Sequence, residues 1–456
     1  MSKENVQFMS LGGVGEVGAS AHLISIGGLK ILLDCGMHPK NEGASKLPDF
    51  SLLNKAPDAI IVTHAHIDHC GSLPYLMKMF PGVQAYCSKP TLQIMDRMLH
   101  NSVSVMKRIR EEQGMEEYPL YTHQDADFAI RRTTGIGVDQ PFVIYPGKDL
   151  QITFNHAGHV LGSVGVTIRT SNHSLFYTGD VCMTDQELLE GFQPPAGLEK
   201  IDTLVVESTY GATEHADDIL AADEIDRLAA AISEVIKNDG TALIPCFALG
   251  RAQEVLNILS RLQYEGQIPM VPIYASGMGR AIYEIYDRNW ESLKPDAALS
   301  PLSEFGKIGD FSRPDVVDDL LATPSIVVAT SGMMIENTPS AVLAEELVQE
   351  THHGIFFVGY CDPATLGARV KDADVGDEFS FVLGADPVEV KLQNFQSFHF
   401  SAHAPRGDLV KLVDSIPSQN LLFVHGDPPA LEWMKFNTPN GRKKYIPSIG
   451  ESIDLS

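Results

Sequence analysis

Cysteine is scarce in this chain, and no two cysteines form a CxxC pair. The six that are present are scattered, which predicts reduced and mostly buried thiols and not a disulfide framework. They are Cys35, Cys70, Cys87, Cys182, Cys246 and Cys361.

Long apolar runs are also missing. None approaches the ~18 residues that a membrane span needs, and the segment MSKENVQFMS lacks the hydrophobic core of a signal peptide. We therefore expect a cytoplasmic protein that does not enter a membrane. With 456 residues, the chain is long for a single hydrophobic core, so we expect two domains.

Positive charge is in short supply, since 34 lysines and arginines stand against 59 aspartates and glutamates and the net charge is −25. Affinity for phosphate backbones normally comes from clustered Lys and Arg, so this balance argues against nucleic-acid binding. It does not exclude an enzyme that acts on phosphodiesters. Divalent metals and a local group of basic residues can bind a phosphodiester even on a protein with a net negative charge.

Metal-ligating side chains, in contrast, are concentrated in residues 63–71, THAHIDHCG. This stretch follows the apolar run 59–62, which predicts a buried strand with a polar loop at its end. Imidazole and carboxylate groups are ligands of zinc and similar divalent ions, and an unpaired buried aspartate would be costly. The pattern predicts a metal site that includes His64, His66, Asp68 and His69.

Further polar side chains follow apolar strands along the chain. His159 comes shortly after the strand predicted at 151–154, and Asp180 follows the run LFYTG. Because strands that end at the same edge of a sheet deliver their loops to one place, these residues are expected to share a site. His156 receives no functional role from the sequence. The other residues in such positions are Asp34, Glu207, His403 and His425.

After residue 209, apolar strands alternate with amphipathic helices, which predicts a second domain with a parallel α/β sheet. The expected helices include 219–237 and 250–262. Three loops in this part contain glycine and expose N–H groups that can bind a phosphate oxygen: ALGRAQ, TSGMM and TLGAR. For each loop, an ordinary turn that requires glycine is an equally good explanation. Arg251 and Ser331 are our weaker candidates for contacts with substrate phosphate.

The motif HAHIDH resembles the HxHxDH signature of the metallo-β-lactamase superfamily, and AGHVLGS and YTGD match its third and fourth motifs. The glycine-containing loops, in their order, resemble the β-CASP insert that caps this domain in a family of nucleases. The resemblance implies an αββα sandwich with an inserted α/β cap. We expect the sandwich at 1–208 and 396–456 and the cap at 209–395.

The resemblance also implies roles for these residues. Two zinc ions, or other divalent ions, would share Asp180 and hold the nucleophilic hydroxide between them. Asp34 would orient a metal-bound histidine, and His403, paired with Glu207, would be the general acid. Asp68 would be both a ligand and a catalytic residue. One metal would take His64, His66, His159 and Asp180, and the other Asp68, His69, His425 and Asp180.

A histidine at the position of His425, within the same resemblance, indicates the RNA-cleaving branch, and SAHAP around His403 resembles the pre-mRNA 3′-end endonuclease. RNA is therefore the expected substrate. Three cap positions depart from the family pattern and leave substrate choice open: Ala275, Glu336 and Cys361. The sequence does not decide between endo- and exonucleolytic cutting, or between a monomer and a homodimer.

Two other functions remain open at this point. The metal motifs and the acidic charge also fit a small-molecule hydrolase of the thioesterase or lactonase type. The family further contains non-catalytic partner subunits, but those have lost metal ligands, whereas every ligand position is filled here.

Overall fold

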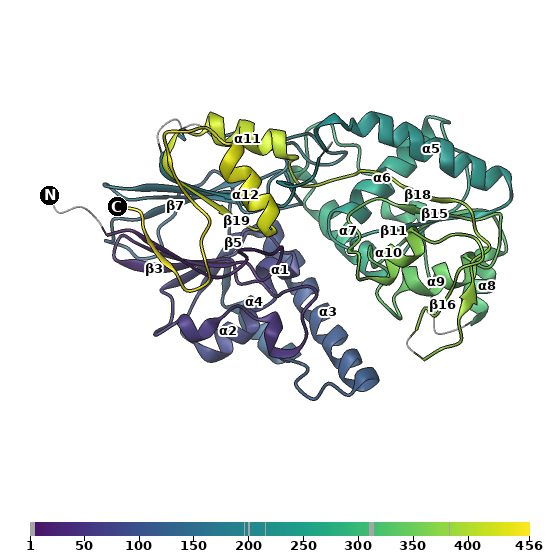
Figure 1. Cartoon of the computed structure of the whole chain (residues 1–456), viewed down its shortest axis with the longest axis horizontal. Helices are drawn as coiled ribbons and strands as arrows, with labels where there is room; N and C mark the ends of the chain where they lie inside the picture. Colours follow the sequence, from purple (N-terminus) through teal and green to yellow (C-terminus); the bar gives the residue numbers. More distant parts are fainter. Residues whose placement is uncertain (1–4, 196, 199–200, 215, 310–313, 383) are drawn as a thin grey trace. The chain divides into compact units, whose positions relative to one another are not determined.

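The computed structural model describes residues 5–195, 197–198, 201–214, 216–309, 314–382 and 384–456. The chain divides into two compact units (Figure 1). The first unit contains Met1–Asp185, Glu190–Asp217 and His403–Ser456, and the second contains Gln186–Leu189 and Asp218–Ala402. The chain therefore leaves the first unit and returns to it at His403.

The first unit is built on two sheets that pack face to face. Residues from both sheets form one buried cluster, which includes Ile24, Leu33, Val166, Val205 and Leu422. The chain forms a hairpin at Gly27-Gly28, where β2 and β3 are antiparallel and both glycines have the positive φ that such turns need. In order across the first sheet, the strands are β21 (Ser452–Asp454), β1 (Gln7–Gly12), β2 (Ala21–Ile26), β3 (Leu29–Leu33), β4 (Ala59–Ile61), β5 (Ala85–Ser88) and β6 (Thr133–Ile136). The second sheet contains β20 (Lys443–Tyr445), β19 (Ser418–Val424), β10 (Ile201–Glu207), β9 (Ser174–Tyr177), β8 (Val164–Arg169) and β7 (Gln151–His156).

Helices cover the outer faces of both sheets (Figure 1). Leu412 and Met434, from the two helices beside the second sheet, are buried in one cluster with Leu204 and Phe423 of its strands. The expected αββα sandwich is thereby confirmed. The helices beside the first sheet are α1 (Ile67–Cys70), α2 (Leu73–Met79), α3 (Lys89–Gln113) and α4 (His123–Arg131), and those beside the second are α11 (Arg406–Ser415) and α12 (Pro428–Asn437).

The second unit is an α/β domain with a parallel six-stranded sheet, as the alternating pattern predicts. Its two core clusters contain strand residues such as Ile244 and Val327 and helix residues such as Leu256 and Leu347. Across the sheet the strands are β13 (Phe305–Lys307), β12 (Ile273–Ala275), β14 (Ser325–Ala329), β11 (Thr241–Pro245), β15 (Gly354–Phe357) and β18 (Phe395–Ser397). The helices are α5 (Ala221–Lys237), α6 (Arg251–Tyr264), α7 (Gly277–Arg288), α8 (Pro314–Leu321), α9 (Pro339–Leu347) and α10 (Leu366–Lys371), and β16 (Glu378–Phe379) pairs with β17 (Val388–Glu389).

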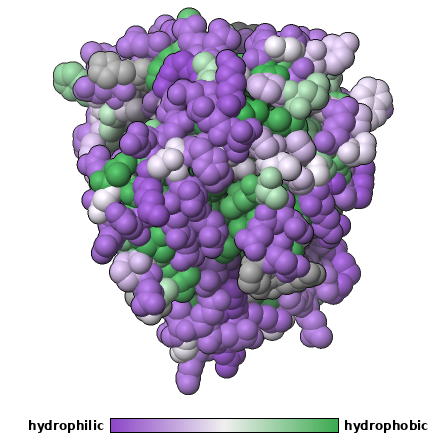
Figure 2. Space-filling view, turned by 90° about the vertical axis from the view of Figure 1, so that its right-hand side faces the viewer, coloured by the Kyte–Doolittle hydropathy of each residue, from purple (hydrophilic) through white to green (hydrophobic). Residues whose placement is uncertain are grey.

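Hydrophilic residues predominate on the face drawn in Figure 2, and hydrophobic residues there form small, separate groups. Within the part of the chain that the structure describes, every helix is too short or too polar to cross a bilayer.

Candidate metal centre

The candidate site lies entirely in the first unit, where loops from both sheets meet. His64 and His66 lie between β4 and α1, and Asp68 and His69 lie within α1. His159, Asp180 and His425 follow β7, β9 and β19, and Glu207 is the last residue of β10. The expectation that these strands deliver their polar residues to one place is therefore met in the geometry.

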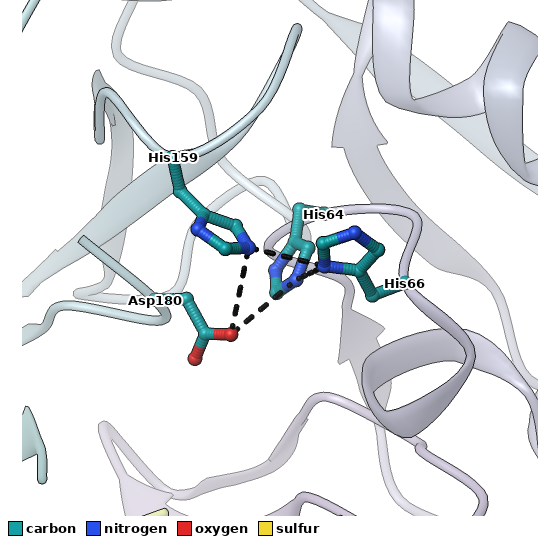
Figure 3. A group of neighbouring side chains, drawn as sticks. All are labelled: His64, His66, His159 and Asp180. Carbon is teal, nitrogen blue, oxygen red and sulfur yellow. Dashed lines mark hydrogen bonds and ion pairs between the residues drawn. The ribbon is translucent and has the colours of Figure 1, made fainter. Parts of the chain in front are cut away.

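A first cluster consists of His64, His66, His159 and Asp180, whose side chains converge in Figure 3. His66 Nδ1 lies 3.1 Å from His64 Nε2 and 3.0 Å from His159 Nε2. Asp180 Oδ2 lies 3.6 Å from His64 Nε2 and 3.7 Å from His159 Nε2. Four ligands at 2.0–2.1 Å from a tetrahedral zinc ion are about 3.3 Å from one another. These four ligand–ligand distances are thus close to those in a zinc coordination shell, and all four ligand atoms lie within 4.8 Å of one another.

A second cluster consists of Asp68, His69 and His425. Asp68 Oδ2 lies 3.3 Å from His425 Nε2 and 3.8 Å from His69 Nε2. Asp180 reaches this cluster as well, because its Oδ2 is 3.3 Å from His69 Nε2 and its Oδ1 is 3.2 Å from His425 Nδ1. Asp180 is therefore positioned to be a ligand shared by both clusters.

Two buried atoms in this group support a metal as the missing partner. His69 Nε2 and Asp180 Oδ1 are inaccessible to solvent, and among the described residues their only close polar neighbours are other candidate ligands, with which they make no hydrogen bond of good geometry. Buried polar atoms without a partner are costly and are rare in native structures. Neutral imidazole nitrogens and carboxylate oxygens are zinc ligands, so the donor set fits divalent ions in both clusters.

The charges of the site favour ionised carboxylates. Burial would raise the pKa of Asp180, but His425, His69 and His64 outweigh it, so the pKa lies well below its usual value. Burial and the neighbouring His69 lower the pKa of His64, which keeps its imidazole neutral. Carboxylate and neutral imidazole are the forms that bind a metal.

Asp34 orients His69 through a dense set of hydrogen bonds. It is fully buried, and its Oδ2 lies 2.8 Å from His69 Nδ1 and accepts a 2.8 Å bond from the Tyr177 hydroxyl. Its Oδ1 accepts a 2.7 Å bond from the Thr63 N–H. The carboxylate thus holds one ring nitrogen of His69 and leaves Nε2 to face the site.

His403 and Glu207 form a pair beside the first cluster. His403 Nδ1 lies 3.2 Å from Glu207 Oε1, and the His403 ring is 4.5 Å from that of His159 between ring centres. Glu207 also accepts a 2.7 Å bond from the Val181 N–H. Burial would lower the pKa of His403, but Glu207, followed by Asp180 and Asp68, raises it to about 9. A protonated imidazole therefore adjoins the clusters at neutral pH.

The two weaker candidates lie in the second unit. Arg251 is the first residue of α6, and its guanidinium contacts the Gln186 side chain. Ser331 Oγ accepts a 3.3 Å bond from the Ile335 N–H. Their contact with substrate stays a prediction.

Three residues that support the site did not stand out from the sequence. Thr63 and Tyr177 both bond to Asp34, and the Thr209 hydroxyl lies 3.2 Å from His425 Nδ1. Thr63 and Tyr177 lie inside THAHIDH and YTGD, so their position beside ligands was the available signal. His156 contacts the Glu190 carbonyl oxygen at 2.9 Å, which is a structural role.

Comparisons with known proteins agree with this geometry. The model described as the metallo-beta-lactamase superfamily matches residues 14–231, and the Beta-Casp domain model matches residues 252–370. A third model, described as the Zn-dependent metallo-hydrolase RNA specificity domain, matches residues 387–445.

Curated relatives align over nearly the whole chain. Transcription termination factor FttA of Pyrococcus horikoshii is 32% identical over 93% of this chain and 66% of its own length. Integrator complex subunit 11 of Danio rerio is 31% identical over 94% of this chain and 71% of its own. An RNase J-like protein of Methanocaldococcus jannaschii is 29% identical over 91% of each. The chain thus spans about two thirds of the length of FttA.

Proposed function

Because the chain belongs to the β-CASP family of the metallo-β-lactamase superfamily, we propose that it is a zinc-dependent ribonuclease that hydrolyses phosphodiester bonds of RNA. The single observation that carries this proposal is the His403–Glu207 pair next to two candidate metal clusters, both of which Asp180 contacts.

Metal binding in this proposal uses the two clusters as two sites. His64, His66, His159 and Asp180 would hold one ion, and Asp68, His69, His425 and Asp180 the other. Two zinc ions, when bound, would lower the pKa of water and neutralise charge on the phosphate in an in-line displacement. Asp34 would fix the orientation of His69.

His403 would be the general acid that protonates the leaving oxygen. Glu207 holds Nδ1 of the ring, so Nε2 is the nitrogen that would carry the proton to the leaving group. The Val181 N–H bond to Glu207 keeps that carboxylate in place. A pKa raised to about 9 keeps His403 protonated, and therefore able to donate, through neutral pH.

RNA is favoured as the substrate by two findings. The model that matches residues 387–445 is described as an RNA specificity domain, and one relative is an RNase J-like protein. A histidine at position 425 also fits the RNA-cleaving branch of the family. The acidic net charge of −25 favours the other candidate, a thioesterase or lactonase that acts on a small molecule.

The test is cleavage of an end-labelled single-stranded RNA by zinc-loaded protein, beside a DNA of the same sequence. We expect RNA to be cut and DNA to remain intact. His403→Ala should lower kcat by about 10²–10⁴-fold, the usual contribution of a general acid, and leave zinc content unchanged. The product ladder separates endonucleolytic from exonucleolytic cutting.

His156→Ala is the matched control, because His156 lies in the same region and has only a backbone contact. This variant should cut RNA at the normal rate. Metal-replete protein that hydrolyses a thioester or lactone but leaves RNA intact would overturn the proposal. Protein that cuts nothing yet binds RNA would indicate a non-catalytic subunit.

A further inference from the structure

Cations are concentrated in one short segment of this acidic chain. Lys435, Arg442, Lys443 and Lys444 lie within ten residues, and no acidic residue occurs between Glu432 and Glu451. We call these four residues the basic strip. All belong to the first unit, at the end of α12 and the start of β20.

The fold brings these cations close together. Lys444 Nζ donates to the carbonyl oxygens of Lys435 and Thr438 at 2.8 Å and 2.6 Å, and thereby caps the end of α12. Arg442 caps α11 in the same manner, through bonds to Val413 O and Ile416 O. Burial lowers the pKa of Lys444, and the charges of Arg442 and Lys435 lower it further.

Little negative charge offsets these cations. Asp414 acts on Arg442, and Glu432 lies one turn before Lys435 on α12, so two carboxylates lie near the four cations. Among the described residues, neither Lys435 nor Lys443 makes an ion pair. Neighbouring like charges without counter-charges raise the free energy of the protein, and an anionic ligand would lower it.

Aromatic side chains lie beside the basic strip. Phe436 follows Lys435 directly, and its side chain is 85% exposed. Trp433 lies one turn earlier on α12, and the Arg406 guanidinium is 4.6 Å from the centre of its ring. Trp433 is half-buried against the core of the first unit, so Phe436 is the ring of this pair that is free to stack. Cations combined with an exposed ring are usual in proteins that bind single-stranded nucleic acid, since rings stack on bases and cations contact phosphates.

The basic strip connects to the candidate metal centre through two elements. α12 begins three residues after His425, and its ten residues span about 15 Å. Lys443 pairs with Asn420 of β19, four residues before the strand ends at Val424, which is roughly 13 Å along the sheet. The basic strip therefore begins more than one nucleotide away from the metal ligands and within the same rigid sandwich.

We propose that the basic strip, together with Phe436, binds the single-stranded RNA that flanks the scissile bond. The inference rests on the proposed ribonuclease function. It also accounts for how a chain with a net charge of −25 can retain RNA: phosphate contacts are confined to one local surface.

The experiment compares the wild type with K435Q/K443Q, since these two lysines do not cap a helix. Binding of a fluorescent 20-nucleotide RNA to metal-free protein is measured by anisotropy at several salt concentrations. We expect Kd to rise about tenfold and the slope of log K against log salt to fall by about 1.4, or 0.7 for each lost phosphate contact. Phe436→Ala should weaken binding about tenfold with no change in slope.

Zinc content and hydrolysis of bis(p-nitrophenyl) phosphate should match the wild type in both variants, because this small diester does not reach the basic strip. K55Q/K78Q is the matched control, since it removes the same charge from exposed lysines elsewhere in the first unit. Wild-type RNA affinity and slope in K435Q/K443Q would overturn the inference. Lost binding to phosphatidylserine vesicles with unchanged RNA binding would instead identify a lipid surface.

These outcomes are distinguishable from failure of the proposed function. A wild-type protein that binds RNA through the basic strip but does not cut it refutes the ribonuclease and leaves the binding surface. A protein that cuts RNA while K435Q/K443Q changes neither KM nor Kd refutes the binding surface alone.

Discussion

Neighbouring charges and burial set the pKa of individual carboxyl groups in this protein. Asp180 and Glu254 are both buried carboxyl groups, but burial is the dominant influence on the pKa of only one of them, Glu254. Three histidines hold the pKa of Asp180 well below its usual value. Burial raises the pKa of Glu254 to about 7, because Arg251 and the Leu188 N–H offset it only in part. The first carboxyl is suited to bind a cation, and the second is most stable when protonated.

The raised pKa of Glu254 predicts a pH-dependent stability of the second unit. The folded state holds this proton more tightly than the unfolded state, whose pKa is 4.5, so the stabilisation is complete below pH 4.5 and is lost as pH rises through 7. The free energy of unfolding should fall by about 3 kcal/mol over that range. Glu254→Gln should remove most of this slope. A slope equal to that of the wild type would contradict the prediction.

Fluorescence can follow the second unit alone. The chain has two tryptophans, Trp290 in the second unit and Trp433 in the first. A Trp433→Phe background leaves Trp290 as the reporter, and urea unfolding of metal-free protein between pH 4.5 and 8.5 gives the slope with and without Glu254→Gln.

At the scale of elements, the metal-binding loop depends on close backbone packing. The loop that follows β3 runs beside α1, where Cys35 N–H donates to His69 O and Met37 N–H to Ile67 O at 2.8 Å and 2.9 Å. Gly36 lies between them, and a Cβ atom there would come within 1.6 Å of the Asp68 carbonyl oxygen. Only glycine permits this approach, and it fixes the position of the Asp68 and His69 side chains.

Gly36→Ala should therefore displace α1 and disturb the second metal cluster. We expect a loss of about 3 kcal/mol in stability, the upper part of the range for overpacking, and weaker binding of one zinc ion. Thermal unfolding and zinc titration measure the two effects. Gly82→Ala is the control, because its added Cβ meets no atom within 4 Å. Normal zinc binding in Gly36→Ala would contradict the prediction, because it would show that the loop accommodates the added methyl group without displacing Asp68.

For the molecule as a whole, stability should depend on metal. Two sites that exist only in the folded state add about 2.7 kcal/mol each at a free zinc concentration 100 times Kd. For a chain of this length, that corresponds to a rise in Tm of roughly 3–5 °C per site. Inductively coupled plasma mass spectrometry should find two zinc ions per chain, and one in Asp68→Ala, whose side chain belongs to the second cluster alone. Two ions retained in Asp68→Ala would contradict this assignment.

The sequence predicted much of the fold because its signals are local. Apolar runs of strand length and amphipathic helices identify elements from a few neighbouring residues, and β4, β7, α5 and α6 agree closely with their predicted ranges. The ligand candidates were also identifiable, since their motifs place histidines and carboxylates directly after strands.

By itself, the sequence determined which residue types could bind metal, the two α/β parts of the chain and their order. Tertiary structure decided the rest, because distances between residues far apart in the chain depend on strand pairing and packing. It brought Asp180 into contact with residues of both clusters and turned Tyr177 and Thr63 toward Asp34. It also gathered Lys435, Arg442 and Lys444 around the ends of two helices, where their charges reinforce one another.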